Sequence, residues 1–164
     1  QANPIEGLFL DGSFAWLGFS FDTLGNADPQ VVAEAGFDPV GQPCLGCRPA
    51  RSPEFTASLG TAYRLPLAGG RFGTVTPRLD ISFQSTTEFE EPNPERTRQN
   101  GFVRADARIT WVSPSEDWEL AIEGTNLTDK LYKIGTLDFF TNLGTTETTF
   151  ARPREFAATV TRRF

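Results

Sequence analysis

Apolar and polar residues alternate along several stretches of this 164-residue chain. Within residues 71–85, the odd positions from Val75 to Phe83 are apolar, whereas the even positions carry Thr, Arg, Asp, Ser and Gln side chains. A period of two is typical of a β-strand with one apolar and one polar face. The same pattern runs through residues 55–65, 102–111, 118–124 and 155–164, and less regularly through 8–22, where a bulge near Gly12 is expected. The sequence therefore predicts about six amphipathic strands.

The segments between these strands alternate in length. Residues 65–71 and 113–117 are short and rich in Pro, Gly, Ser or Asp, as tight turns are. Residues of about 23–53, 89–100 and 135–150 form longer, polar segments that are expected to be loops. If each strand runs antiparallel to its neighbour, all tight turns lie at one end of the sheet and all long loops at the other. This predicts an all-β, antiparallel up-and-down meander.

Two architectures fit such a meander: a transmembrane β-barrel, and a soluble β-sandwich or lipocalin-like binding module. No stretch reaches the roughly 18 consecutive apolar residues that a membrane helix requires, so a helical membrane protein is excluded. Three observations favour the barrel. The loop lengths are segregated as in outer-membrane barrels, only two of the 15 basic residues are Lys, and aromatic residues such as Trp16 and Trp118 gather near the predicted strand ends, where a barrel meets the membrane interface.

The composition argues against most enzymes and against nucleic-acid binding. The chain has no His, which excludes Ser-His-Asp triads and HExxH zinc sites. Neither a catalytic activity nor a cofactor is expected; an enzyme built on a barrel surface would need catalytic residues upstream of Gln1. With 15 basic and 21 acidic residues, the formal net charge is −6, which gives no electrostatic reason to expect a nucleic-acid partner.

Three motifs occur together near the C-terminus. Residues 118–132 read WELAIEGTNLTDKLY, residues 151–156 read ARPREF, and the chain closes on RRF. The motif residues are Asn126, Leu127, Asp129 and Tyr132 in the first, Pro153 and Arg154 in the second, and Phe164 at the end. This combination resembles the C-terminal end of TonB-dependent outer-membrane receptors, in which an NLxDxxY element precedes a last strand that opens with Pro-Arg and closes on Phe. Residues 52–63 and 103–108 are similar to the preceding strands of the same barrels.

The resemblance implies that residues 1–164 are the C-terminal part of a barrel of about 22 strands. A plug domain and the earlier strands would precede it in the full protein, in keeping with a chain that does not begin with Met. The implied location is the outer membrane, with Phe164 at the periplasmic side and the loops 23–53, 89–100 and 135–150 outside the cell.

The implied function is active uptake of a scarce nutrient, such as a ferric siderophore, cobalamin or an oligosaccharide. The expected partners are outer-membrane lipid and lipopolysaccharide, the plug domain of the same full-length chain, and the TonB complex, which would act through the absent N-terminal part. A further expected partner is the barrel assembly machinery, for which the resemblance makes Phe164 the signal.

Five charged residues lie on the polar sides of two neighbouring predicted strands. They are Arg78 and Asp80 in the first strand, and Arg104, Asp106 and Arg108 in the second. In a barrel these side chains would face the lumen. There they either line a substrate path or pair with one another and with plug residues, and the second arrangement is favoured because ion pairs are commonly structural.

Cys44 and Cys47 form a CxxC motif in the longest predicted loop. Two thiols without His supply only half of a tetrahedral zinc site. A thioredoxin-like redox site needs a βαβ unit, which the sequence does not show. The expectation is a small disulfide that braces an exposed loop in an oxidising compartment.

Overall fold

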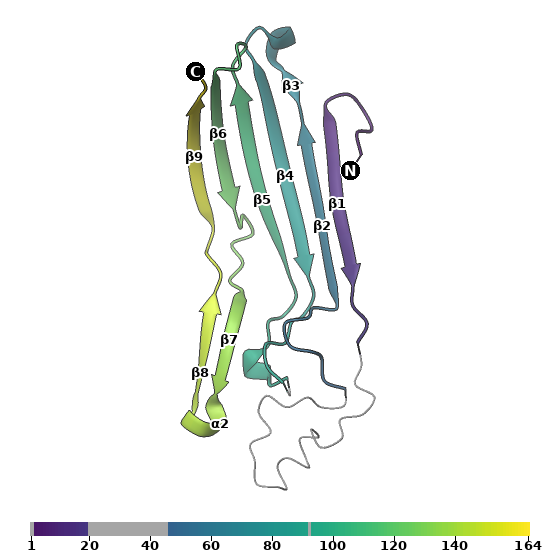
Figure 1. Cartoon of the computed structure of the whole chain (residues 1–164), viewed down its shortest axis with the longest axis vertical. Coiled ribbons are helices and arrows are strands. Elements are labelled where there is room, and N and C mark those ends of the chain that lie inside the picture. The colour runs from purple at the N-terminus through teal and green to yellow at the C-terminus, as the bar shows by residue number, and fades with distance from the viewer. Residues whose placement is uncertain (1, 20–45, 92) are drawn as a thin grey trace.

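The computed structural model describes residues 2–19, 46–91 and 93–164, and most of its elements are strands (Figure 1). The long strands are β1 (Leu8–Trp16), β2 (Phe55–Tyr63), β4 (Thr74–Gln84), β5 (Phe102–Val112), β6 (Trp118–Thr125) and β9 (Glu155–Arg162). The shorter elements are β3 (Leu65–Pro66), the 3-10 helices η2 (Leu67–Gly70) and η3 (Glu95–Thr97), β7 (Lys133–Phe139), α2 (Phe140–Leu143) and β8 (Thr145–Phe150). Among the described residues, no helix has the length and apolarity needed to cross a membrane.

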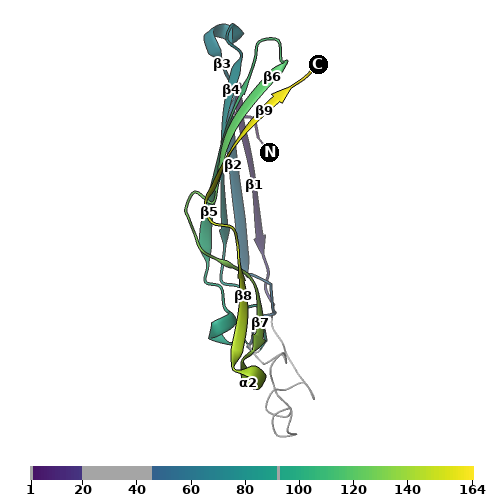
Figure 2. The same cartoon turned by 90° about the vertical axis from the view of Figure 1, so that its left-hand side faces the viewer.

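The main sheet has the strand order β1-β2-β4-β5-β6-β9, and the short β3 pairs with β4. Every neighbouring pair in it is antiparallel. The predicted all-β, up-and-down meander of six long strands is therefore confirmed. The sheet is a single curved layer (Figure 2), and within the described residues it stays open, with β1 and β9 as its two edges.

The first strand differs from its prediction in two respects. The register between β1 and β2 runs without a break, so the bulge expected near Gly12 is wrong. Gly12 lies instead opposite Leu59 on the apolar face, and its lack of a side chain explains why the alternation in β1 looks irregular. β1 also ends at Trp16, whereas the sequence predicts a strand over 8–22, of which residues 20–22 lie outside the described part of the chain.

The register collects the apolar residues of the long strands on one face. Leu59 of β2 lies opposite Ile81 of β4, which lies opposite Ala105 of β5. Ile109 of β5 lies opposite Ile122 of β6. Most of these side chains are exposed, with 57% for Leu59 and 66% for Ile122, because no second layer of described residues covers them (Figure 2). An apolar face of this extent needs a covering medium, and a β-sandwich would supply one only through a second sheet.

The long-loop end of the molecule holds more structure than the sequence predicts. Segment 135–150, expected to be a loop, is mostly the hairpin β7–β8 with α2 at its tip. Segment 89–100 contains η3, and most of the predicted loop 23–53 lies outside the described residues. Several of the buried side chains of the described chain gather at this end, among them Thr87, Glu88, Phe89, Thr97 and Gln99. Most of the buried side chains of the described residues therefore lie among the loops.

The turn at the opposite end depends on one glycine. Gly73 has φ +83°, and a Cβ on it would lie 2.0 Å from the carbonyl oxygen of Val112 at the end of β5. The preceding carbonyl, of Phe72, accepts a hydrogen bond from the indole nitrogen of Trp111 at 2.8 Å. The start of β4 can therefore approach β5 this closely only because residue 73 has no side chain.

We expect Gly73→Ala to lower the free energy of unfolding by roughly 3 kcal/mol or more, because the methyl group must displace the β5 backbone while φ stays positive. Gly70→Ala is the matched control, since Gly70 also has a positive φ (+93°) but no atom within 4 Å of the added Cβ. It should cost only about 1 kcal/mol of backbone strain. Chemical denaturation of the purified protein measures both changes, and equal losses would contradict the assigned role of Gly73.

Candidate functional site

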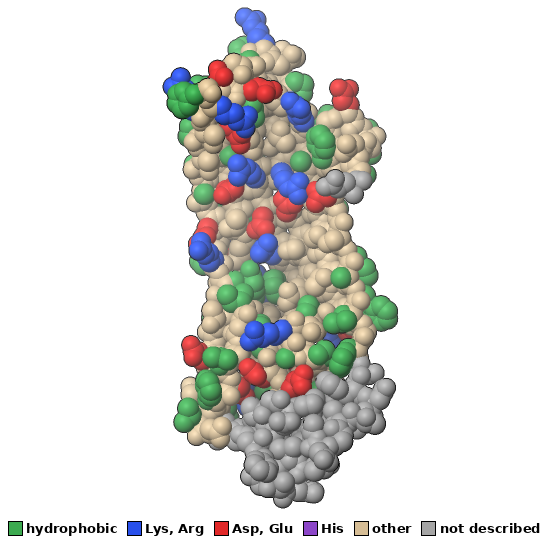
Figure 3. All heavy atoms as spheres, in the orientation of Figure 1, with side chains coloured by type: hydrophobic (Ala, Val, Ile, Leu, Met, Phe, Trp, Pro, Cys, Tyr) green, Lys and Arg blue, Asp and Glu red, His purple; other side chains and the backbone are tan. Residues whose placement is uncertain are grey.

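The face opposite the apolar one carries the charged side chains of the sheet, which gather over its middle (Figure 3). All five charged candidates lie on this polar face: Arg78 and Asp80 of β4, and Arg104, Asp106 and Arg108 of β5. The register sets Arg78 opposite Arg108, and Asp80 opposite Asp106. Directly opposed like charges are destabilising. This face therefore depends on opposite charges placed along the same strand or on the flanking strands.

Arg78 has carboxylate partners on both sides. Its Nε donates to Asp80 Oδ2 at 2.8 Å, and its Nη2 donates to Asp11 Oδ1 of β1 at 3.1 Å. To reach β1, the side chain passes over β2 at Gly60, where a Cβ would lie 2.6 Å from Nη2. Gly60 thus leaves the room that the ion pair needs. Sequence reasoning missed Asp11. The strand register identifies it, because Asp11 lies opposite Gly60, which lies opposite Asp80.

The two arginines of β5 are paired as well. Arg104 lies 3.0 Å from Asp106, and Arg108 donates to Glu123 of β6 at 2.8 Å and lies 3.8 Å from Glu119. These arginine side chains remain about 40% exposed, so each pair is worth about 1 kcal/mol or less. The charged candidates therefore pair with one another and with flanking strands, and their role in substrate binding stays a prediction.

Asn126 joins the end of β6 to both connections of the β7–β8 hairpin. The residue is buried and has φ +49°. Its Nδ2 donates to the carbonyl oxygens of Lys130 and Arg152 at 3.0 and 3.2 Å. Its Oδ1 accepts from the Lys130 backbone N–H and from the Thr128 hydroxyl. Its backbone N–H donates to Asp106 Oδ1 at 2.8 Å. The side-chain amide is thus fully used.

The remaining motif residues surround Asn126. Asp129 accepts a hydrogen bond from the backbone N–H of Arg154 at 3.3 Å, and the two side chains lie 3.5 Å apart. Leu127 donates its backbone N–H to the carbonyl oxygen of Ala105 in β5 at 2.7 Å. Pro153 precedes Arg154 in the connection to β9. The NLxDxxY element and the Pro-Arg element therefore meet in space, which gives a structural reason for their joint occurrence.

Tyr132 extends the polar face toward the loops. Its ring stacks on Phe102 with centroids 4.4 Å apart, and its hydroxyl accepts a hydrogen bond from Arg104 Nη1 at 3.4 Å. The stacked rings border a hollow of about 300 Å³. Its other lining includes the short hydroxyl side chains Ser13, Thr56, Ser58 and Ser82. Such a lining offers stacking and hydrogen bonds to a bound molecule.

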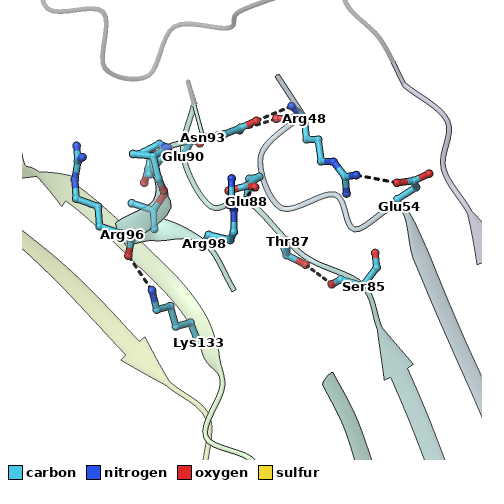
Figure 4. A network of polar contacts seen from close by, with 12 residues as sticks. Arg48, Glu54, Ser85, Thr87, Glu88, Glu90, Asn93, Arg96, Arg98 and Lys133 are labelled. Carbon is cyan, nitrogen blue, oxygen red and sulfur yellow. Dashed lines mark hydrogen bonds and ion pairs between the residues drawn. The ribbon is translucent and has the colours of Figure 1, made fainter. Parts of the chain in front are cut away.

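A second polar network lies among the loops (Figure 4). Arg98 Nε donates to the buried Glu88 carboxylate at 2.7 Å. The Asn93 amide exchanges two hydrogen bonds with the backbone of Arg48, at 2.6 and 2.9 Å. Burial raises the pKa of Glu90 in the same network. The sequence predicts only a solvated acidic loop here, whereas the structure buries Glu88 and pairs it with Arg98.

Phe164 lies beyond the end of β9 and is fully exposed. The guanidinium of Arg162 lies 4.8 Å from its ring centroid and 5.0 Å from that of Trp118. Its role as an assembly signal stays a prediction.

Of the two cysteines predicted to form a disulfide, only Cys47 lies among the described residues. Cys47 is buried and disulfide-bonded, whereas Cys44 lies outside the described residues, so the pairing of the two stays a prediction. In the described ranges, no group of three or more Cys, Asp or Glu side chains is arranged to hold a metal ion.

No protein-family model and no curated protein matches the sequence. Among solved structures, the chain is similar to the ferric yersiniabactin uptake receptor FyuA from Yersinia pestis, with a TM-score of 0.59 and 19% sequence identity over 69% of this chain. The likeness is one of fold. The match spans 16% of the length of that receptor chain, so the comparison relates this open antiparallel sheet to one portion of a larger uptake receptor.

We expect Asn126→Ala to lower the free energy of unfolding by about 2–3 kcal/mol, because it removes the buried amide that bonds the carbonyl oxygens of residues 130 and 152 and the Lys130 N–H. The control is Asn100→Ala, since the Asn100 side chain is exposed and makes no hydrogen bond to the described residues. Its effect should stay within about 0.5 kcal/mol. Denaturant titration separates the two variants, and a loss no larger for Asn126→Ala would refute the role given to this residue.

Proposed function

We propose that this chain is the C-terminal part of the barrel of a TonB-dependent outer-membrane receptor. The observation that carries the proposal is a one-layer antiparallel sheet with an uncovered apolar face and an ion-paired polar face. A bilayer supplies the apolar medium that the first face needs, and the polar interior of a barrel of about 22 strands suits the second. The fold similarity to an uptake receptor supports the same assignment.

Each part of the structure has a place in this arrangement. The apolar face contacts outer-membrane lipid and lipopolysaccharide, and the polar face lines the lumen and meets the plug domain. β1 and β9 pair with further strands of the closed barrel. Turns 65–73 and 113–117 lie in the periplasm, and the long segments lie outside the cell. Trp16 and Trp118 lie at opposite ends of the sheet (Figure 1), as the two aromatic girdles of a membrane barrel do.

The proposed activity is uptake of a scarce nutrient, driven by the TonB complex through the plug, with no covalent step. The similar receptor takes up ferric yersiniabactin, so a ferric siderophore is the first substrate class to test, ahead of cobalamin and oligosaccharides.

The test uses the full-length protein in a Gram-negative cell. We expect the protein in the outer-membrane fraction, with a gel mobility that changes on heating, and accumulation of a labelled nutrient that requires TonB. A protein recovered in a soluble fraction without detergent, or one with unchanged mobility, would contradict the proposal.

The C-terminal aromatic allows a separate prediction about assembly. Phe164→Ala should reduce the heat-modifiable outer-membrane form several-fold, because the assembly machinery would lose its signal. Phe72→Ala is the matched control, since Phe72 is also an exposed phenylalanine at the turn end of the sheet. Quantitative gels of membrane fractions give the readout; equal yields of the two variants would count against a signal at residue 164.

A further inference from the structure

The β7–β8 hairpin is fastened at one buried carboxylate. The Asp138 side chain in β7 has no exposed surface. Its Oδ1 accepts hydrogen bonds from Arg96 Nε at 2.9 Å, from the Thr146 hydroxyl at 2.9 Å and from the Phe140 backbone N–H at 3.2 Å. Its Oδ2 pairs with Nη2 of the same arginine. The guanidinium of Arg96 also lies 4.8 Å from the ring centroid of Phe140.

Two further hydrogen bonds join the hairpin to the segment around η3. Lys133 Nζ donates to the Arg96 carbonyl oxygen at 2.8 Å (Figure 4), and the Lys133 backbone N–H donates to Gln99 Oε1 at 2.7 Å. The same segment is bound to residues 46–54, because the Asn93 amide accepts from the Arg48 backbone N–H at 2.6 Å and donates to the Arg48 carbonyl oxygen at 2.9 Å. The three outer segments therefore form one network.

The base and the tip of the hairpin are held differently. Asn126 fixes both connections at the base through the carbonyl oxygens of Lys130 and Arg152. The register between β7 and β8 then shifts between Lys133 and Gly135, which interrupts the regular pairing just above the base. Beyond this irregularity, the ion pair of Asp138 is the charged contact that holds the described hairpin to its neighbour.

We propose that Arg96 and Asp138 form a latch that holds the β7–β8 hairpin closed on segment 93–99. When the two charges separate, the hairpin swings as a unit about residues 132–135 while its base remains in place. This device goes beyond the proposed function and does not depend on it. In a receptor barrel it would lie at the outer mouth of the lumen.

The electrostatics keep the latch closed at neutral pH. Arg96 lowers the pKa of Asp138 below its ordinary value, against the opposing effect of burial. The stabilisation is therefore complete above the unfolded-state pKa of about 3.9 and is lost only as the pH falls through the lower folded value. The other charged groups near this pair are the Lys133 ammonium and Glu90, whose pKa is raised by burial. Of the two paired side chains, Arg96 is 37% exposed, whereas Asp138 has no exposed surface.

Hydrogen exchange of the full-length protein tests the latch through Asp138→Asn. A two-stranded hairpin without its packing is marginally stable, so release should speed amide exchange in β7, β8 and η3 by about tenfold or more. Exchange in β4 and β5 should not change. Arg96→Lys, which keeps the charge but loses the paired geometry, should give an intermediate rate.

Glu147→Gln is the matched control, because it removes the same charge from the opposite face of the hairpin, where Glu147 is exposed. It should leave hairpin exchange as in the unsubstituted protein. Unchanged hairpin exchange in Asp138→Asn would overturn the latch. Faster exchange in β4 and β5 as well would also overturn it, since the carboxylate would then stabilise the whole fold. Neither readout uses transport, so the proposed function can fail independently.

Discussion

The antiparallel register of the main sheet is the constraint on which the rest of the structure depends. From β1–β2 to β6–β9, neighbouring strands pair so that their apolar residues share one face. A slip of one residue in any pair would move the apolar residues of that strand to the charged face. Because the described residues form a single layer, no second sheet among them covers such an error, and the apolar face needs a covering medium.

The same register creates the problem that the polar face resolves. It places Arg78 opposite Arg108. Each arginine therefore pairs with a carboxylate on a flanking strand, Arg78 with Asp11 and Arg108 with Glu123. Asp106 links this charged row to the motif near the C-terminus, since it pairs with Arg104 and also accepts the backbone N–H of Asn126. The motif residues around Asn126 and the ion pairs of the polar face are thus joined in one connected set of contacts.

The sequence predicts the long strands and their faces well, because alternation at period two is a local property that β4 and β5 display without interruption. The prediction fails for segments whose structure depends on tertiary contacts and not on a local sequence pattern. In β8, Thr residues occupy both faces, so TTETTF shows no apolar alternation and reads as a loop. Arg96 and Asp138 lie in separate loop segments with ordinary polar composition, and only the folded chain brings them together. At Gly12 the sequence suggests a bulge, because a glycine on the apolar face interrupts the alternation in the same way as an extra, unpaired residue would.

The central claim is that alternate residues of these strands face lipid. Spin labels at Ala158 and Val160, on the apolar face, and at Ala157 and Thr159, on the polar face, test it directly in the full-length protein in bilayers, with Cys44 and Cys47 replaced by Ser. The accessibility ratio of oxygen to a water-soluble nickel complex should alternate along β9, high at 158 and 160 and low at 157 and 159. A ratio without this period, or high nickel access at all four positions, would contradict the account.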